Sequence, residues 1–536
     1  MAAQRLWPVT LCVLRVVKRT VACSVVAALL GAATFAAQPL HRVGALTAGV
    51  ARAGQSPVLS CDAVLQQSLP QARITTSVTV KAEGDQPAHC RVSVTLTPST
   101  DSDIKMQLWL PLSGWNGKFM MVGNGGWSGA VPMPAMSEPL RRGYAVAGTD
   151  TGHEGGRGSF AFGHPEKLID FSHRAVHETV VKGKALIAAF YGGQPRYAYW
   201  NGCSSGGKQG LKAVQQYPED FDGVVVGAPA NDWMRQQARW TSTLVANLPK
   251  DKPAVLGPDQ FALLHKGALA QCDARDGLKD GEIQDPRACD FNASSLACKA
   301  GDAPGSCLTA EQVAVADRLS GALRNPKTGE LISPGLAPGS ESGWGSSVSR
   351  LSDVAVDTFA VALNAPQWDM FSFDPARDLI AARRGAPGLD ALNTDLSAFK
   401  SRGGRIVSYH GWADPGIPTE QTINYYESVV AKQGGLPQTQ SFYRLFLVPA
   451  MGHCSGAYSV DWISTLEQWV EGARAPDVVL AQHLPKAGIR TMCAYPNVAR
   501  LQGGNGEQPV DLVCGAAPRG ARPEHSPGVP APVRLP

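Results

Sequence analysis

The stretch that decides the fold is residues 197–216, YAYWNGCSSGGKQGLKAVQQ. Its first four residues predict a strand, and residues 207–216 predict a helix. Between them, residues 202–206 have the form Gly-x-Ser-x-Gly, with Ser204 alone in the central place. In this position the motif indicates a nucleophile elbow, where a strained turn lifts the serine hydroxyl above the sheet and the flanking glycines avoid collisions. Ser204 is therefore the candidate nucleophile, although a serine-rich turn would also match the motif.

Predicted strands and helices alternate on both sides of this stretch. Alternating apolar and polar residues predict antiparallel strands over 74–96 and 104–110, and continuous apolar runs predict buried strands at 119–122 and 144–147. A helical pattern over 173–192 and a strand at 223–226 favour a mostly parallel, doubly wound α/β sheet. The pattern stops near 232 and resumes near 394, so we interpret the block between them as an inserted lid.

The two ends of the chain differ from the rest. Residues 1–37 contain four basic residues and no acidic residue, and they end in the apolar run VACSVVAALLGAATFAA. This is typical of a secretory signal peptide, and an uncleaved membrane anchor is the alternative. We expect a linker over 38–58, core segments over 59–231 and 394–516 around a lid over 232–393, and a Pro-rich tail over 517–536.

Charge and cysteine content narrow the function classes. The formal net charge is +4, and without the four bases of the leader it is about zero. A neutral chain has no counterion-release drive toward nucleic acid, so we expect no nucleic-acid partner. No later run is apolar over the length of the leader's run, so we expect no membrane contact after leader cleavage. Ten of the twelve cysteines lie beyond the leader. Their even number predicts disulfides, and a secreted or periplasmic protein.

A base and an acid for Ser204 follow later strands. Asp414 comes after the strand RIVSYH, and His453 comes after FYRLFLV. Ser, Asp, His is the chain order of α/β-hydrolase triads. The alternatives are a turn-forming aspartate before Pro415, a structural histidine at 453, and His410 as a rival base.

Two further features surround the candidate triad. The amide of Ser205 begins a helix and suits an oxyanion hole, with a second donor expected from the Gly-rich loop 123–126. If Ser204 and His453 are within hydrogen-bond reach, the adjacent Cys203 and Cys454 are within disulfide range. Two free thiols are the alternative.

Cys-Ser, then Asp, then His-Cys resembles the signature of the tannase and feruloyl esterase family. Other family-like stretches are WNGKF (115–119), GNGGWSG (123–129), DTGHEG (150–155), FDGVVVGAPA (221–230) and LVPAMGHCSG (447–456). The resemblance implies an α/β-hydrolase core with a lid, the triad Ser204, Asp414 and His453, and an oxyanion hole from the amides of Gly126 and Ser205. It also implies five disulfides: Cys61–Cys90, Cys203–Cys454, Cys272–Cys289, Cys298–Cys307 and Cys493–Cys514.

The lid contains an acidic loop, CDARDGLKDGEI (272–283). Its carboxylates at short spacing and its glycines suit a hard cation, but it is not an EF-hand. From the residues alone a solvated acidic turn is the better interpretation. The family resemblance implies a structural Ca²⁺ and no catalytic cofactor. The implied ligands are the side chains of Asp273, Asp276 and Asp280 and the backbone carbonyls of Leu278 and Glu282.

The expected function is that of a secreted serine esterase acting on small aromatic esters. The resemblance implies hydrolysis of feruloyl, other hydroxycinnamoyl, or galloyl esters through an acyl-enzyme. Hydrolysis of a terephthalate monoester, as in MHETase-like enzymes, is an alternative within the family. A catalytically inactive hydrolase fold used for binding and a serine carboxypeptidase are alternatives from other classes.

Overall fold

The computed structural model describes residues 49–516, except for 51, 485, 487 and 505–507. The predicted signal peptide, most of the predicted linker and the Pro-rich tail lie outside the described residues. The described residues belong to one compact unit.

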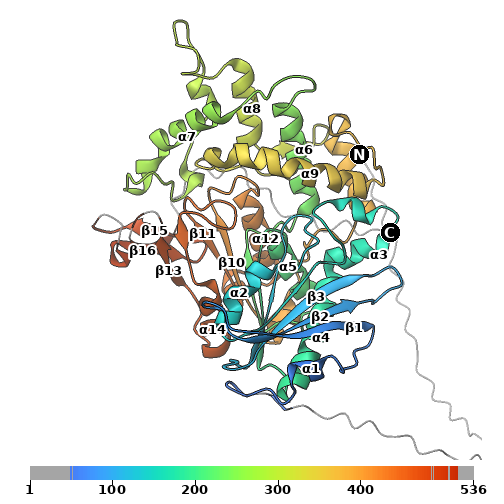
Figure 1. The fold of residues 1–536 in the computed structure, drawn as a ribbon. Coiled ribbons are helices and arrows are strands. Elements are labelled where there is room, and N and C mark those ends of the chain that lie inside the picture. The colour runs from blue at the N-terminus through green and yellow to red at the C-terminus, as the bar shows by residue number, and fades with distance from the viewer. Residues whose placement is uncertain (1–48, 51, 485, 487, 505–507, 517–536) are drawn as a thin grey trace, which may run out of the picture. The chain divides into compact units, whose positions relative to one another are not determined.

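The main sheet has nine strands in the order β1-β2-β3-β5-β4-β6-β7-β10-β11 (Figure 1). The first three strands and β5 pair antiparallel, and the strands from β5 to β11 pair parallel. The strands are β1 (Ala72–Val80), β2 (His89–Leu96), β3 (Ile104–Pro111), β4 (Lys118–Val122), β5 (Ala145–Thr149), β6 (Tyr197–Cys203), β7 (Gly223–Gly227), β10 (Arg405–Gly411) and β11 (Tyr443–Val448).

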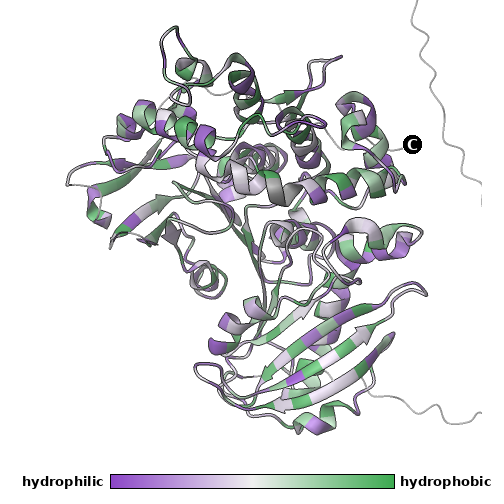
Figure 2. Cartoon of the chain, turned by 45° about the horizontal axis from the view of Figure 1, so that its top comes forward, coloured by the Kyte–Doolittle hydropathy of each residue, from purple (hydrophilic) through white to green (hydrophobic). Residues whose placement is uncertain are grey.

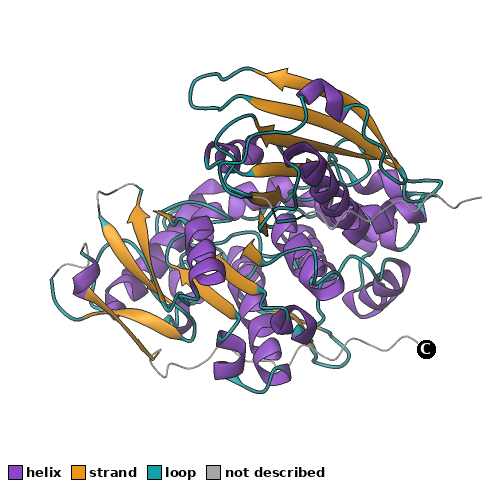
Figure 3. Cartoon of the chain, turned by 90° about the horizontal axis from the view of Figure 1, so that it is seen from below, coloured by secondary structure: helices purple, strands orange, loops and turns teal. Residues whose placement is uncertain are grey.

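Helices cover both faces of this sheet (Figure 3). Because successive side chains of a strand point to opposite faces, Met121 packs in one hydrophobic cluster and Met120 in the other. The first cluster includes residues of α4 (Ala175–Tyr191), α5 (Ser205–Gln216) and α12 (Thr419–Lys432). The second includes residues of α2 (Met133–Arg141) and α14 (Trp462–Gly472).

The antiparallel part of the sheet is less enclosed than the parallel part. Half-buried and exposed residues mix along β1 and none of them is fully buried, whereas every residue of β5 and β7 is buried. The same contrast is visible as mixed hydrophilic and hydrophobic bands along the antiparallel strands (Figure 2). Buried parallel strands read as continuous apolar runs, which is why the sequence predicts them.

The inserted lid leaves the sheet after β7 and returns before β10. These two strands are parallel neighbours, with Val224 opposite Ile406. The two ends of the insertion meet at Asn231 and Ala391, where the amide of Ala391 donates to the carbonyl of Asn231 at 2.8 Å. The lid helices α6–α9 lie beyond the ends of the strands in Figure 1. The lid contains α6 (Trp233–Asn247), α7 (Pro258–Cys272), α8 (Ala310–Ser320), α9 (Trp344–Ala362), α10 (Pro375–Gly385) and the hairpin β8 (Leu323–Arg324) with β9 (Leu331–Ser333).

Short elements complete the described chain. Two small antiparallel sheets between residues 458 and 516 were not predicted from the sequence. They consist of β12 (Tyr458–Ser459), β13 (Val478–His483) and β14 (Ile489–Cys493), and of β15 (Asn497–Leu501) and β16 (Leu512–Ala516). The remaining α-helices are α1 (Cys61–Val64), α3 (Pro165–Ile169), α11 (Ser397–Ser401) and α13 (Leu436–Gln440).

Ten cysteines form five disulfides, and they pair as the family resemblance implies. The bonds are Cys61–Cys90, Cys203–Cys454, Cys272–Cys289, Cys298–Cys307 and Cys493–Cys514. Two of them lie within the lid, and Cys203–Cys454 joins the two core segments across 251 residues of sequence.

Candidate active site

Ser204 lies at a sharp turn between β6 and α5. Its φ is +64°, a backbone conformation that non-glycine residues rarely adopt. The turn depends on the neighbouring glycines: a Cβ on Gly202 would lie 2.7 Å from the carbonyl of Gly206, and one on Gly207 would lie 2.4 Å from another backbone oxygen. Ser204 is only partly buried, so its hydroxyl is accessible. The residues around 204 thus have the geometry of a nucleophile elbow.

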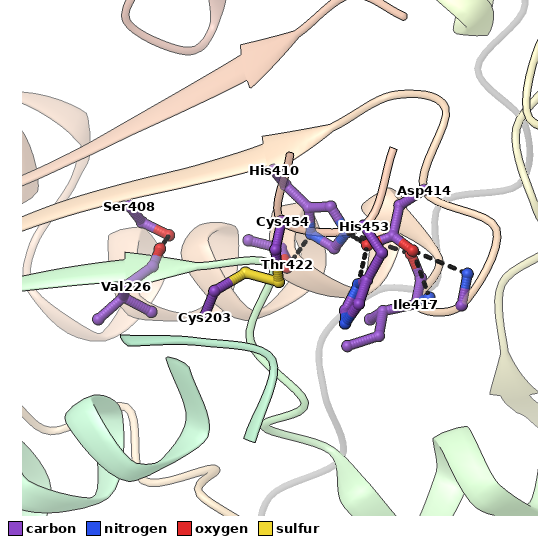
Figure 4. The surroundings of a disulfide bond; sticks show 10 residues. Cys203, Val226, Ser408, His410, Asp414, Ile417, Thr422, His453 and Cys454 are labelled. Carbon is purple, nitrogen blue, oxygen red and sulfur yellow. Dashed lines mark hydrogen bonds and ion pairs between the residues drawn. A yellow bond between two sulfur atoms is a disulfide. The ribbon is translucent and has the colours of Figure 1, made fainter. Parts of the chain in front are cut away.

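Asp414 and His453 meet beyond the ends of β10 and β11. The Nδ1 of His453 lies 2.7 Å from Oδ2 of Asp414 (Figure 4). The other oxygen of Asp414 accepts hydrogen bonds from the amides of Gly416 and Ile417, at 2.7 and 2.9 Å. The Asp414 side chain is fully buried, whereas that of His453 is 35% exposed. This is the arrangement of a base held by an orienting carboxylate.

The Asp414 carboxylate is stabilised as an anion. Burial opposes its ionisation, but the adjacent His453 and the hydrogen bonds from two histidines outweigh burial and hold the pKa of Asp414 well below its usual value. Asp414 therefore stays ionised throughout the neutral range and can stabilise positive charge on His453.

His410, the rival base, is the second of these histidines. It is fully buried, with Nε2 3.0 Å from Oδ2 of Asp414 and 3.1 Å from the carbonyl of Ile417. A carboxylate and a carbonyl can only accept, so Nε2 carries the hydrogen. Nδ1 lies 2.7 Å from the hydroxyl of Thr422 (Figure 4). Both ring nitrogens of His410 are therefore used inside the protein, against the acid rather than against Ser204.

The Cys203–Cys454 disulfide holds the turn and the histidine loop together (Figure 4). Its two Cα atoms are 5.9 Å apart. Cys203 directly precedes Ser204, and Cys454 directly follows His453. The structure therefore brings the neighbourhoods of the candidate nucleophile and the candidate base together.

The two expected oxyanion residues also meet. Ser205 is the first residue of α5, where helix amides point toward the turn, and it is 1% exposed. Its hydroxyl donates a hydrogen bond of 3.0 Å to the carbonyl of Gly126. Gly126 has a φ of +49°, which favours glycine there.

The lid contacts both loops of this site, which the sequence analysis did not foresee. The indole of Trp240 in α6 donates to the carbonyl of Gly416, two residues after Asp414, at 2.6 Å. The indole of Trp127, next to Gly126, reaches the carbonyl of Val354 in α9 at 3.4 Å. These contacts join residues more than 170 positions apart, so no local sequence pattern predicts them.

Lys208, one helical turn after Ser204, is fully buried. Its Nζ lies over the rings of Trp233 and Phe171, at 4.2 and 4.8 Å from their centroids. Its Nζ has no hydrogen-bond partner among the described residues, and burial lowers the pKa of Lys208 to about 7. The lysine is thus a buried amine behind the site.

The carboxylates of the acidic loop 272–283 find most of their hydrogen-bond and ion-pair partners within the protein. Asp273 accepts from backbone amides at 280 and 281, and Asp280 pairs with Arg490 at 2.7 Å. The side chain of Glu282 also contacts Arg490, at 2.8 Å. Oδ2 of Asp276 is buried without a hydrogen-bond partner. Among the described residues, no three His, Cys, Asp or Glu side chains stand in an arrangement that could hold a metal ion.

Comparison with known proteins accounts for this architecture. The family model "Tannase and feruloyl esterase" matches residues 90–514. A probable feruloyl esterase B-1 of Aspergillus flavus is 34% identical over 436 residues, which cover 76% of this chain and 82% of that protein. An uncharacterized esterase of Xanthomonas campestris is 33% identical over 533 residues, which cover 86% of this chain and 92% of that protein.

Solved structures agree with these relatives. The crystal structure of feruloyl esterase B from Aspergillus oryzae matches with a TM-score of 0.80 at 31% identity, over 85% of this chain and 100% of that one. The tannin acyl hydrolase from Aspergillus niger shares the fold, with a TM-score of 0.67 at 21% identity over 87% and 97% of the two chains. The chain therefore belongs to the tannase and feruloyl esterase family of α/β-hydrolases and is a carboxylic ester hydrolase.

Proposed function

We propose that this hydrolase cleaves esters of aromatic acids, with hydroxycinnamoyl esters such as feruloyl esters preferred over galloyl esters. The relatives that cover most of the chain are named feruloyl esterases, which favours the hydroxycinnamoyl class. The proposal extends to the mechanism, which uses Ser204, His453 and Asp414 as a triad. The observation that carries the triad is the 2.7 Å contact between His453 and Asp414, beside a disulfide that ends next to Ser204.

The first half-reaction acylates the enzyme. The Ser204 hydroxyl oxygen attacks the ester carbonyl carbon while Nε2 of His453 takes the hydroxyl proton. The carbonyl oxygen becomes an oxyanion, which the amides of Gly126 and Ser205 stabilise. When the tetrahedral intermediate collapses, the bond to the alcohol breaks, and His453 gives its proton to the departing alcohol.

The second half-reaction releases the acid. Water attacks the acyl-serine carbonyl, His453 takes a proton from that water, and the same amides stabilise the second oxyanion. Collapse breaks the bond to Ser204, which recovers its proton from His453, and the aromatic acid leaves. In both halves Asp414 holds the imidazole orientation and stabilises its positive charge.

We also propose that the protein is exported. Five disulfides support an oxidising compartment, because thiols stay reduced in most cytosolic environments. Within the part of the chain that the structure describes, no helix is long and apolar enough to cross a membrane.

A structural calcium ion in the acidic loop remains a proposal. The loop's carboxylates and carbonyls are the oxygen ligands that calcium prefers, and the unpartnered oxygen of Asp276 fits a cation there. To hold the ion, the side chains of Asp273, Asp276 and Asp280 would have to move together from the positions described above, with the carbonyls of Leu278 and Glu282 completing the ligand set. It would stabilise the loop beside the Cys272–Cys289 disulfide and take no part in the reaction.

A product-resolved substrate panel tests the proposed specificity. Wild type and Ser204→Ala are assayed with methyl ferulate, methyl gallate, a terephthalate monoester and a nitrophenyl acetate. We expect the highest kcat/KM on methyl ferulate, and a loss of at least about 10⁴-fold in Ser204→Ala on every ester. A preference for gallate or for the terephthalate monoester would refute the proposed acyl class without affecting the triad.

A further inference from the structure

The loop 123–126 is held against helix α5 by two side chains that lie one helical turn apart on that helix. Ser205 donates its hydroxyl to the carbonyl of Gly126 at 3.0 Å. The Gln209 side chain accepts a hydrogen bond from the backbone amide of Asn124 at 3.0 Å and donates one to Oδ1 of Asn124 at 3.2 Å. Gln209 is 3% exposed and Ser205 is 1% exposed. The hydrogen bonds of Gln209 are buried, and that of Ser205 is partly buried.

The backbones of the loop and the helix touch directly beneath these side chains. A Cβ on Gly123 would lie 2.6 Å from the Cα of Gly206, and one on Gly206 would lie 3.1 Å from the Cα of Gly123. On the side away from the helix, the side-chain amide of Asn124 donates to the carbonyls of Ala130 and Thr149 at 3.0 and 2.8 Å. The loop is therefore fixed on both of its sides.

This geometry brackets Gly126. Gln209 fixes the chain at Asn124, two residues before Gly126. Ser205 fixes the carbonyl of Gly126, which sets the orientation of the peptide plane after Gly126. The Gly126 amide lies between these two fixed points, so its direction is restricted from both sides at a residue whose φ of +49° reflects the conformational freedom of glycine. Ser205 also provides the second expected donor through its backbone amide.

We propose that the Ser205 side chain is a positioning residue that couples the two oxyanion donors. Its own amide is one donor, and its hydroxyl holds the glycine that carries the other. Gln209 supports the same coupling from the next turn of α5. This inference rests on the proposed function, because it needs the two amides to face the oxyanion. It assigns a role to the second serine of the GCSSG stretch, which the nucleophile does not require.

The predicted effect is specific to the transition state. Ser205→Ala keeps the backbone amide but frees the Gly126 carbonyl, so oxyanion binding weakens while substrate binding is little changed. Removing a whole oxyanion donor typically lowers kcat by 10²–10³, so a loosened donor should lower it about tenfold. The KM should stay within about twofold, since a contact made only in the transition state affects kcat.

A matched control is available elsewhere in the sheet. Ser408 is fully buried and donates its hydroxyl to the carbonyl of Val226 at 2.9 Å, the same kind of hydrogen bond away from the loop (Figure 4). Ser408→Ala should lose stability as Ser205→Ala does but keep wild-type kcat. Ser205→Thr retains the hydroxyl and should restore kcat to within about threefold of wild type.

The experiment measures kcat, KM and melting temperature for these three variants, for Ser204→Ala and for wild type. It also measures the affinity of phenylboronic acid, which becomes tetrahedral when it adds the serine oxygen, and of ferulic acid as a ground-state ligand. We expect Ser205→Ala to lose boronate affinity about as much as kcat, with ferulate affinity unchanged.

Three results would overturn the inference. If Ser204→Ala is inactive but Ser205→Ala keeps wild-type kcat and boronate affinity, the coupling is wrong while the triad stands. If Ser205→Ala and Ser408→Ala lose kcat equally, Ser205 has only a structural role. Full activity in Ser204→Ala would refute the triad, and the coupling with it.

Discussion

Removing the Cys203–Cys454 disulfide should damage both stability and catalysis. A disulfide limits the conformational freedom of the unfolded chain, and the effect grows with the length of the loop it closes. This bond closes 251 residues. The chain-entropy relation then gives about 5.5 kcal/mol of stabilisation at 25 °C. The Cys298–Cys307 bond closes only 9 residues and gives about 2.6 kcal/mol by the same relation.

The two bonds should differ more in their effect on rate. Cys203–Cys454 adjoins both the candidate nucleophile and the candidate base, whereas Cys298–Cys307 lies in the lid. A displacement of about 1 Å between reacting groups typically lowers a rate about 100-fold. We therefore expect the double variant Cys203→Ser/Cys454→Ser to lose about 10- to 100-fold in kcat. Cys298→Ser/Cys307→Ser should keep kcat within about twofold.

The assay combines denaturant unfolding with steady-state kinetics on methyl ferulate for both double variants. Kinetics are measured well below each variant's melting temperature, so that partial unfolding does not lower the apparent rate. The reasoning is refuted if the Cys203/Cys454 variant retains wild-type kcat. It is also refuted if the two variants lose the same stability, because loop length would then not decide the effect.

Three further predictions concern buried groups. His410→Leu removes a donor that holds the pKa of Asp414 down, so activity, which needs the ionised carboxylate, should be lost at a higher pH on the acid side; an unchanged pH–rate profile would contradict this. Lys208→Met should be the more stable form at pH 7. As the pH rises from about 7 to 10.5, the free energy of unfolding of wild type should increase by about 1.4 kcal/mol per pH unit toward that of Lys208→Met. The reason is that the unfolded lysine binds a proton that the folded one lacks. A difference in stability that does not vary with pH would disprove the buried neutral amine. If the loop 272–283 holds calcium, EGTA should lower the melting temperature and added CaCl₂ should restore it, whereas an identical melting temperature with and without EGTA would refute the site.

The sequence predicted the part of the fold that repeats a simple pattern. The elbow around Ser204 was predictable because glycines at fixed spacing, a preceding strand and a following helix are all local signals. The loss of that alternation predicted an insertion into the sheet. What the local signals could not provide was that β7 and β10 are neighbours in the sheet, or that Ala391 hydrogen-bonds to Asn231 and so brings both ends of the lid together.

Contacts between distant residues account for what the sequence did not reveal. His410 was a rival base on spacing alone, and only the structure shows that it is buried against Asp414. The pairing of Arg490 with Asp280 and Glu282 joins residues more than 200 positions apart and changes the surroundings of the acidic loop. The hydroxyl of Ser205 likewise acquires a partner 79 positions away. Such pairs leave no periodic or compositional trace in one sequence.

The central claim is that Ser204 carries the acyl group during the reaction. The most direct measurement reacts the enzyme with a feruloyl ester, quenches it in acid within the first turnover, and locates the acyl group by peptide mass mapping. We predict one feruloyl group on Ser204, and none in Ser204→Ala. An acyl group on Ser205 or elsewhere, or full hydrolysis without any acylated serine, would contradict the account.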